Sequence, residues 1–178
     1  MAASLPLSNA IVVMGVSGSG KTSVGELLAE RLGFPFIDGD DFHPVANVEK
    51  MSAGIPLTDE DRWPWLDILG AKIGELTRDE GGVIAAASSL RKVYRERMTQ
   101  AAGFKILFAH LDGPAEIITE RMAKRTDHYM PLSLLDSQIA TLEPPEEDEN
   151  AIAVPIDGTV EEITDSILRA LDQEGRSS

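Results

Sequence analysis

The chain has 178 residues, a formal net charge of −14, 43% hydrophobic and 26% charged residues, and no cysteine. These proportions predict one globular domain over residues 1–178, and they exclude a disulfide framework, a thiolate metal site and a cysteine nucleophile. The acidic balance disfavours nucleic acid and anionic membrane as partners. The opening MAASLPLSNAIVVMGV has neither the basic region of a signal peptide nor an apolar run long enough to span a bilayer, so we expect a cytoplasmic protein.

Five short apolar runs predict strands that are buried on both faces of a sheet. The runs are continuous and do not alternate with polar residues, which is typical of a parallel sheet covered by helices on both sides. In chain order they are residues 10–14 (AIVVM), 34–37 (FPFI), 83–87 (VIAAA), 105–109 (KILFA) and 151–156 (AIAVPI).

Stretches with helical periodicity lie between these runs, at residues 22–32, 59–76, 90–101, 114–124 and 160–171. Pro114 suits the first helical position after the turn at Asp112 and Gly113. Strands that alternate with helices predict an α/β sandwich. Two segments depart from the alternation: residues 43–62, which are long and polar, and residues 125–150, which hold a helical patch at 133–142 and the acidic run EPPEEDEN. We expect a substrate-side insertion in the first and a solvated loop in the acidic run.

The segment after the first predicted strand matches the phosphate-binding pattern G-x-x-x-x-G-K-[ST] at every fixed position. Its glycines let backbone N–H groups wrap an anion, Lys21 reaches the β- and γ-phosphates, and the Thr22 hydroxyl suits Mg²⁺. The alternative is a chance match in a flexible Gly/Ser loop, which the flanking strand and helix disfavour. The predicted nucleotide-binding residues are Gly15, Val16, Ser17, Gly18, Ser19, Gly20, Lys21 and Thr22.

The motif alone does not separate kinases from other nucleotide-binding proteins. The chain is short for a motor ATPase, and it lacks the N-K-x-D run with which GTPases read guanine. The second predicted strand runs into Asp38-Gly39-Asp40-Asp41, and parallel strands bring their carboxyl ends to one ligand crevice. A carboxylate there orients an acceptor hydroxyl and takes its proton, an effect of about 10²- to 10⁴-fold. The residues therefore favour a kinase.

Within this segment we assign Asp40 as the general base, Asp38 as a Mg²⁺ ligand through water, and His43 as a contact to the acceptor. The alternative is an ordinary polar turn closed by an Asx hydrogen bond. The third predicted strand ends in Ala87-Ser88-Ser89, without the aspartate that commonly binds Mg²⁺ in P-loop enzymes. Thr22, phosphates, water and Asp38 are then the expected metal ligands.

Several sequence blocks together resemble the P-loop gluconokinase family: MGVSGSGKT, FIDGDDFHP, NVEKMSAGIPLTDEDRWPWL, SSLRKVYRE, and RTDHYM followed by LLDSQIATLEPP. The resemblance implies ATP-dependent phosphorylation of D-gluconate to 6-phospho-D-gluconate with Mg²⁺. It also implies a three-layer fold like that of shikimate and nucleoside monophosphate kinases, with a parallel five-stranded sheet in the order 2-3-1-4-5. A substrate-side segment at residues 43–80, a moving lid at residues 121–142 and a homodimer belong to the same expectation.

Gluconate carries one carboxylate, so its recognition requires a cation, preferably a guanidinium. Arg62 and Arg91 are the preferred candidates, whereas Lys92 and Arg95 are less favoured. The alternative for each of these cations is solvation or a salt bridge on a helix. The residues assigned to the acceptor are Asp40, His43, Arg62, Ser89, Arg91 and His128, with Asn47 and Lys50 as weaker candidates.

The lid region carries further cations. We expect Arg121 to stack on adenine and Arg125 to neutralise charge on the transferring phosphoryl group, which makes Lys21, Asp40 and Arg125 the predicted catalytic residues. The alternative for Arg121 is the exposed face of a helix. Two other functions stay open at this point, a kinase for another hydroxy acid such as shikimate and a non-catalytic module that binds ATP as a switch.

Overall fold

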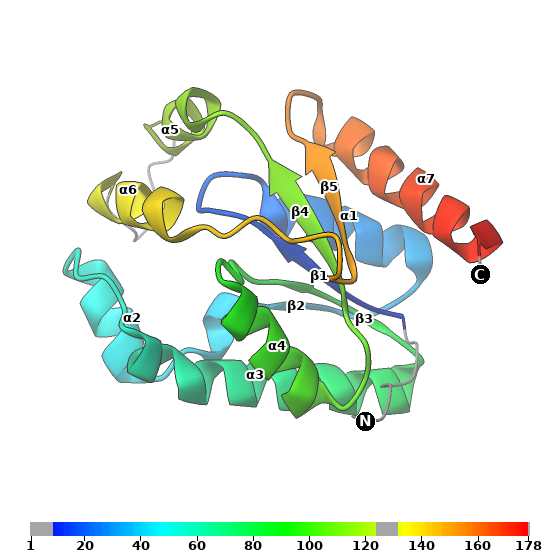
Figure 1. Ribbon diagram of the computed structural model, residues 1–178, viewed down its shortest axis with the longest axis horizontal. Helices are drawn as coiled ribbons and strands as arrows, with labels where there is room; N and C mark the ends of the chain where they lie inside the picture. Colours follow the sequence, from blue (N-terminus) through cyan, green and yellow to red (C-terminus); the bar gives the residue numbers. More distant parts are fainter. Residues whose placement is uncertain (1–8, 124–131, 178) are drawn as a thin grey trace.

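The computed structural model describes residues 9–123 and 132–177, and it places five strands in one parallel sheet (Figure 1). The strand order is β2-β3-β1-β4-β5, which confirms the predicted order. β1 lies at the centre, with Ala10 beside Val83 on β3 and Ile11 beside Leu107 on β4. The strands are β1 (Ala10–Met14), β2 (Phe36–Asp38), β3 (Val83–Ala86), β4 (Leu107–Asp112) and β5 (Ala151–Pro155).

Side chains along β1 alternate between two cores, as the pleat of a strand requires. Ile11 and Val13 face a core shared with α1 and α7, whereas Val12 and Met14 face a core shared with α3 and α4. The sheet is thus the middle of three layers (Figure 1). The helices are α1 (Lys21–Leu32), α2 (Val45–Ser52), α3 (Asp59–Glu80), α4 (Lys92–Ala102), α5 (Ala115–Ala123), α6 (Leu132–Thr141) and α7 (Val160–Ser177), with a 3₁₀ turn, η1 (Gly39–Phe42).

α3 begins at a capping box and packs tightly against α4. The Thr58 hydroxyl accepts from the Asp61 N–H at 3.1 Å, and the Asp61 carboxylate accepts from the Thr58 N–H at 2.9 Å. Farther along, a Cβ added to Gly74 would lie 2.2 Å from the carbonyl oxygen of Ala102. Glycine therefore permits a close approach of the two helices, which brings their first turns together beside the carboxyl ends of the strands.

Most predicted elements lie within a few residues of the observed ones. An exception is the segment after β2, for which the sequence predicts no helix, only a substrate-side insertion at residues 43–62. It holds η1 and α2. The Pro44 carbonyl accepts from the Asn47 and Val48 N–H groups and so starts α2. This helix buries only Asn47 and Met51, whereas Val45 and Val48 are exposed, so its apolar residues do not mark a buried face in the sequence.

The acidic run was expected to be a solvated loop, and that expectation is wrong in one respect. Its carboxylates bind the cations at the start of α4. A net charge of −14 makes such cations scarce, so nearby carboxylates compete for them. The pairs are Arg91 with Glu143, Lys92 with Glu146 and Asp148, and Arg95 with Glu149.

Among the helices in the described ranges, none is both long and apolar enough to cross a bilayer.

Candidate active site

The predicted phosphate loop forms the turn between β1 and α1. Gly15, Gly18 and Gly20 have φ values of +149°, +86° and +100°, a region that side chains disfavour. A Cβ on Gly15 would also lie 2.7 Å from the Ser19 hydroxyl oxygen. The loop lines a cavity of about 390 Å³, whose wall is formed by Ser17, Gly18, Gly20, Lys21, Thr22, Asp38, Asp40 and Ala86.

Carboxylates at the end of β2 lie beside this loop. Asp38 caps η1, since its Oδ1 accepts from the Asp40 N–H at 3.0 Å. Its Oδ2 accepts from the Thr22 hydroxyl at 3.4 Å. The two residues predicted to hold Mg²⁺ are therefore neighbours, and both offer the oxygen ligands that Mg²⁺ prefers.

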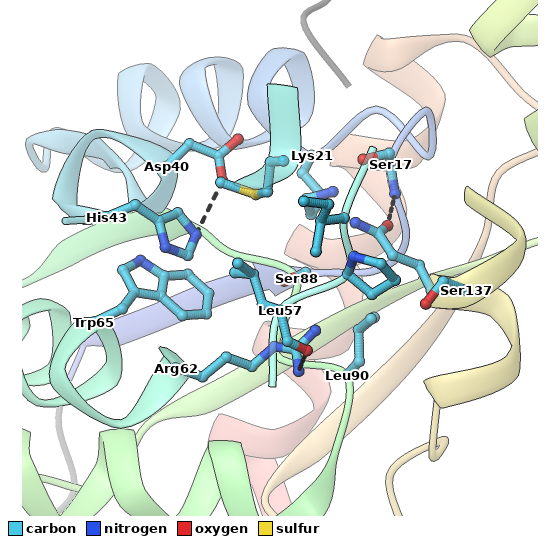
Figure 2. A pocket seen from close by; sticks show the side chains of 14 residues that line it. Ser17, Lys21, Asp40, His43, Leu57, Arg62, Trp65, Ser88, Leu90 and Ser137 are labelled. Atoms are coloured by element: carbon cyan, nitrogen blue, oxygen red, sulfur yellow. Dashed lines mark hydrogen bonds and ion pairs between the residues drawn. The ribbon is translucent and has the colours of Figure 1, made fainter. Parts of the chain in front are cut away.

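A second cavity, the acceptor cleft, opens next to the first and spans about 590 Å³ of space, part of it open to solvent. Asp40, His43 and Trp65 line one side of it, with Ser17 and Ser137 across the opening and Arg62 below Trp65 in this view (Figure 2). The other lining residues are Lys21, Met51, Ile55, Pro56, Leu57, Ser88, Leu90 and Gln138. The wall combines apolar surface with a few polar groups, as small-molecule sites do.

Three residues line both cavities: Ser17, Lys21 and Asp40. The Asp40 side chain is 50% exposed to this opening. Desolvation by the surrounding walls raises the pKa of the Asp40 carboxyl, the Lys21 ammonium lowers it, and the nearby carboxylates raise it further. A group transferred between the two cavities would pass between this carboxylate and the phosphate loop.

His43 is buried in the wall of the acceptor cleft. Its side chain is 4% exposed and stacks on the Trp65 indole, with 4.1 Å between ring centroids. Desolvation and the Arg62 guanidinium lower the pKa of His43 to about 4, so the ring is neutral near pH 7. Its Nε2 lies 4.0 Å from Asp40 Oδ1.

Arg62 is the predicted carboxylate-binding cation that reaches the acceptor cleft. Its side chain is 16% exposed, and Nη1 donates to the Leu57 carbonyl at 2.7 Å and to the Tyr94 hydroxyl at 3.0 Å. Tyr94 donates in turn to Asp59. These contacts fix the guanidinium beside the cleft.

Other candidates lie outside the cleft wall. Arg91 is held by Asp59 at 2.8 Å and Glu143 at 3.2 Å. Arg95 is 2% exposed and bound to the acidic run, and its Nη1 donates to the Ser89 carbonyl at 2.8 Å. Ser89 is fully buried with φ +51°, and its hydroxyl donates to the Ala87 carbonyl, so Ser88 lines the cleft instead.

Residues near the lid divide into two groups. Arg121 lies in the last turn of α5, and its Nη2 donates to the Ile156 carbonyl at 2.7 Å. Arg125 and His128 lie outside the described residues.

Two lining residues that carry no signal in the sequence are Ser137 and Gln138, which bring α6 to the cleft. The Ser17 N–H donates to Gln138 Oε1 at 2.7 Å. Both residues fall in a block quoted for the family resemblance, but no local pattern assigns them a role.

Known proteins resemble this chain in both sequence and fold. A family model described as an AAA domain matches residues 11–145. The gluconokinase of Gluconobacter oxydans is 43% identical over 164 residues, which cover 92% of this chain and 92% of the relative. A gluconokinase structure from Sinorhizobium meliloti is 44% identical, with a TM-score of 0.80 and coverage of 98% of this chain and 97% of that one. An unliganded sugar kinase from Janibacter sp. is 43% identical, with a TM-score of 0.87 and coverage of 93% and 95%.

Proposed function

The chain belongs to the gluconokinase family, and from this premise we propose that it transfers the γ-phosphoryl group of ATP to the 6-hydroxyl of D-gluconate. The products are 6-phospho-D-gluconate and ADP. Relatives of this name match nearly the whole chain, which disfavours a shikimate kinase or a non-catalytic ATP switch.

One observation carries the proposal: the phosphate cavity and the acceptor cleft share Ser17, Lys21 and Asp40. A triphosphate held by the loop would present its terminal group at this shared boundary. An acceptor in the neighbouring cleft would present its hydroxyl to the same point. Positioning of this kind supplies much of the rate enhancement in phosphoryl transfer.

Different residues of the chain then bind the phosphates, accept the hydroxyl proton and bind the gluconate carboxylate. Loop amides and Lys21 bind the β- and γ-phosphates and stabilise the charge that develops there. Asp40 takes the hydroxyl proton while the bond from oxygen to phosphorus forms and the bond to ADP breaks. Arg62 binds the gluconate carboxylate from the wall of the cleft, and His43 contacts the acceptor. Arg125 neutralises charge from the lid side.

Mg²⁺ fits beside Thr22 and Asp38, whose side-chain oxygens lie 3.4 Å apart. When bound with ATP, the ion neutralises charge on the phosphate oxygens. A cytoplasmic location and a homodimer, both expected from the sequence, belong to the same proposal.

A coupled ADP-release assay with gluconate, shikimate, glycerate and AMP tests the substrate. We expect turnover with gluconate. If another acceptor were phosphorylated and gluconate were not, the substrate assignment would be overturned.

Asp40→Asn should lower kcat by about 10²- to 10⁴-fold while ATP affinity is retained. The matched control is Asp41→Asn, because Asp41 is exposed and lines neither cavity. Equal kcat values for these two variants would remove Asp40 from the mechanism.

Arg62→Met tests the binding of the carboxylate. A hydrogen bond to a charged group contributes about 1.5–3 kcal/mol, so the KM for gluconate should rise roughly 10- to 100-fold with little change in the KM for ATP. Arg97→Met is the control, since Arg97 on α4 pairs with Asp67 on α3 and lines neither cavity. A KM for gluconate that does not move in Arg62→Met would assign the carboxylate to another cation.

A further inference from the structure

A histidine beside a general base can donate a proton, accept one or carry a charge, and its tautomer decides which. His43 presents Nε2 toward Asp40 at 4.0 Å and Nδ1 toward Asn47 at 3.2 Å. The charged groups that face the ring are Asp40 on η1 and Arg62 on α3. The protonation of Nε2 therefore determines what the ring offers to the reacting groups.

The orientation of the Asn47 side chain follows from its second contact. Its Nδ2 lies 2.9 Å from the main-chain carbonyl oxygen of Asp61, and a carbonyl oxygen only accepts. The NH₂ end of the amide must therefore face Asp61. The capping box with Thr58 and the 2.7 Å ion pair with Lys50 hold this turn of α3 in place.

The same Asn47 nitrogen contacts His43 Nδ1, so the second N–H bond of the amide points at the ring. An NH₂ group donates, and Nδ1 must therefore accept with its lone pair. In a neutral imidazole the proton then lies on Nε2. Asn47 is 3% exposed, and both N–H bonds of its amide are used inside the protein, so it is a poor donor to a gluconate hydroxyl.

We propose that Asn47 is a positioning residue for phosphoryl transfer, because it fixes His43 as the neutral tautomer with its proton on Nε2. This proposal rests on the proposed function. The Nε2–H points toward Asp40, 4.0 Å from its Oδ1, where it donates to the acceptor hydroxyl, and the ring does not compete for the hydroxyl proton. Asp40 remains the acceptor of that proton. Stacking on Trp65 keeps the ring plane in the orientation that directs Nε2 to the cleft.

The tautomer can be read directly by long-range ¹H–¹⁵N NMR of the full chain at neutral pH. The resonances of His43 are assigned by their loss in His43→Gln, which separates them from those of the two other histidines. We expect one protonated nitrogen, Nε2, and one unprotonated nitrogen, Nδ1. A proton on Nδ1, or on both nitrogens, would overturn the proposal.

Asn47→Leu removes the donor while a side chain of similar size fills the site. We expect the His43 nitrogen shifts to move toward the average of two tautomers, and kcat to fall about tenfold with little change in the KM for ATP. Circular dichroism reports whether this variant folds. Nitrogen shifts identical to those of the parent chain in a folded Asn47→Leu would show that Asn47 does not set the tautomer.

Two replacements of His43 separate a donor at Nε2 from a donor at Nδ1. Glutamine carries its NH₂ near the position of Nε2, whereas asparagine carries it near Nδ1. We expect the kcat of His43→Gln to exceed that of His43→Asn by about tenfold, and the reverse order would overturn the donor role. If the parent chain phosphorylates no tested acceptor, the proposed function fails while the NMR result still decides the tautomer.

Discussion

Replacing Glu149 with glutamine would leave a buried guanidinium without its counter-charge. The Arg95 side chain is 2% exposed and that of Glu149 is 10% exposed. The pair is bidentate, with Nε to Oε1 at 2.6 Å and Nη2 to Oε2 at 3.1 Å. Removing one partner of a buried ion pair typically costs about 3–5 kcal/mol. Glutamine keeps the shape and one accepting oxygen, so we expect a loss of about 3 kcal/mol.

For a chain of this length, 1 kcal/mol corresponds to about 2–4 °C in Tm, so Glu149→Gln should melt about 6–12 °C below the parent chain. Differential scanning calorimetry and urea denaturation measure the change. The matched control is Asp67→Asn on α3, which breaks the bidentate pair with Arg97, a residue on the same helix as Arg95. There Arg97 is 42% exposed and Asp67 is 48% exposed. Such a pair contributes about 0.2–1 kcal/mol. Equal losses in both variants would refute the argument from burial.

The same arginine also supports the acceptor cleft. Its Nη1 donates to the Ser89 carbonyl, next to Ser88 in the cleft wall. Replacing both Arg95 and Glu149 with methionine removes two buried charges together, which often restores stability. This double variant should regain most of the lost stability yet show a raised KM for gluconate, because the turn at Ser89 loses its donor. An unchanged KM would confine Arg95 to a structural role.

Two further predictions concern stability. Gly74→Ala should lower the free energy of unfolding by about 1–3 kcal/mol, because the new Cβ would lie 2.2 Å from the Ala102 carbonyl oxygen. The control, Ala71→Gly on the exposed face of α3, should cost about 1 kcal/mol through helix propensity alone. Urea denaturation measures both losses, and equal losses would contradict the clash at Gly74. The pKa of His43 is about 4 in the fold against 6.5 for a free histidine, so the unfolded chain binds a proton first as the pH falls. The free energy of unfolding should therefore fall by about 3 kcal/mol between pH 6.5 and about pH 4 through this histidine. Denaturation curves measured across that pH range should show a smaller fall for His43→Gln, which lacks the titrating group.

The sheet was predictable because burial on both faces leaves continuous apolar runs in the sequence. β1 was predicted with both of its bounds. β4 was predicted to end at residue 109, yet it continues through His110 to Asp112. Pairing with β1 and β5 on either side extends the ladder past the last apolar residue of the run. Hydrogen bonding to neighbouring strands thus overrides local hydrophobicity at the end of the strand.

Some residues of the candidate site are marked by a local sequence motif, whereas the placement of others depends on contacts with residues far away in the sequence. The phosphate loop and the Asp38–Asp40 turn act through backbone geometry that a few consecutive residues determine, so their pattern was visible in the sequence. Arg91 is a preferred candidate for the carboxylate ligand and Arg95 a less favoured one, yet both are paired with carboxylates more than fifty residues away in the sequence. The role of Asn47 depends on the carbonyl oxygen of Asp61, a group that every residue carries and that no motif can mark. A motif therefore predicts where the proposed phosphoryl transfer takes place, whereas the donors that orient its acceptor can be proposed only once distant backbone groups are in position.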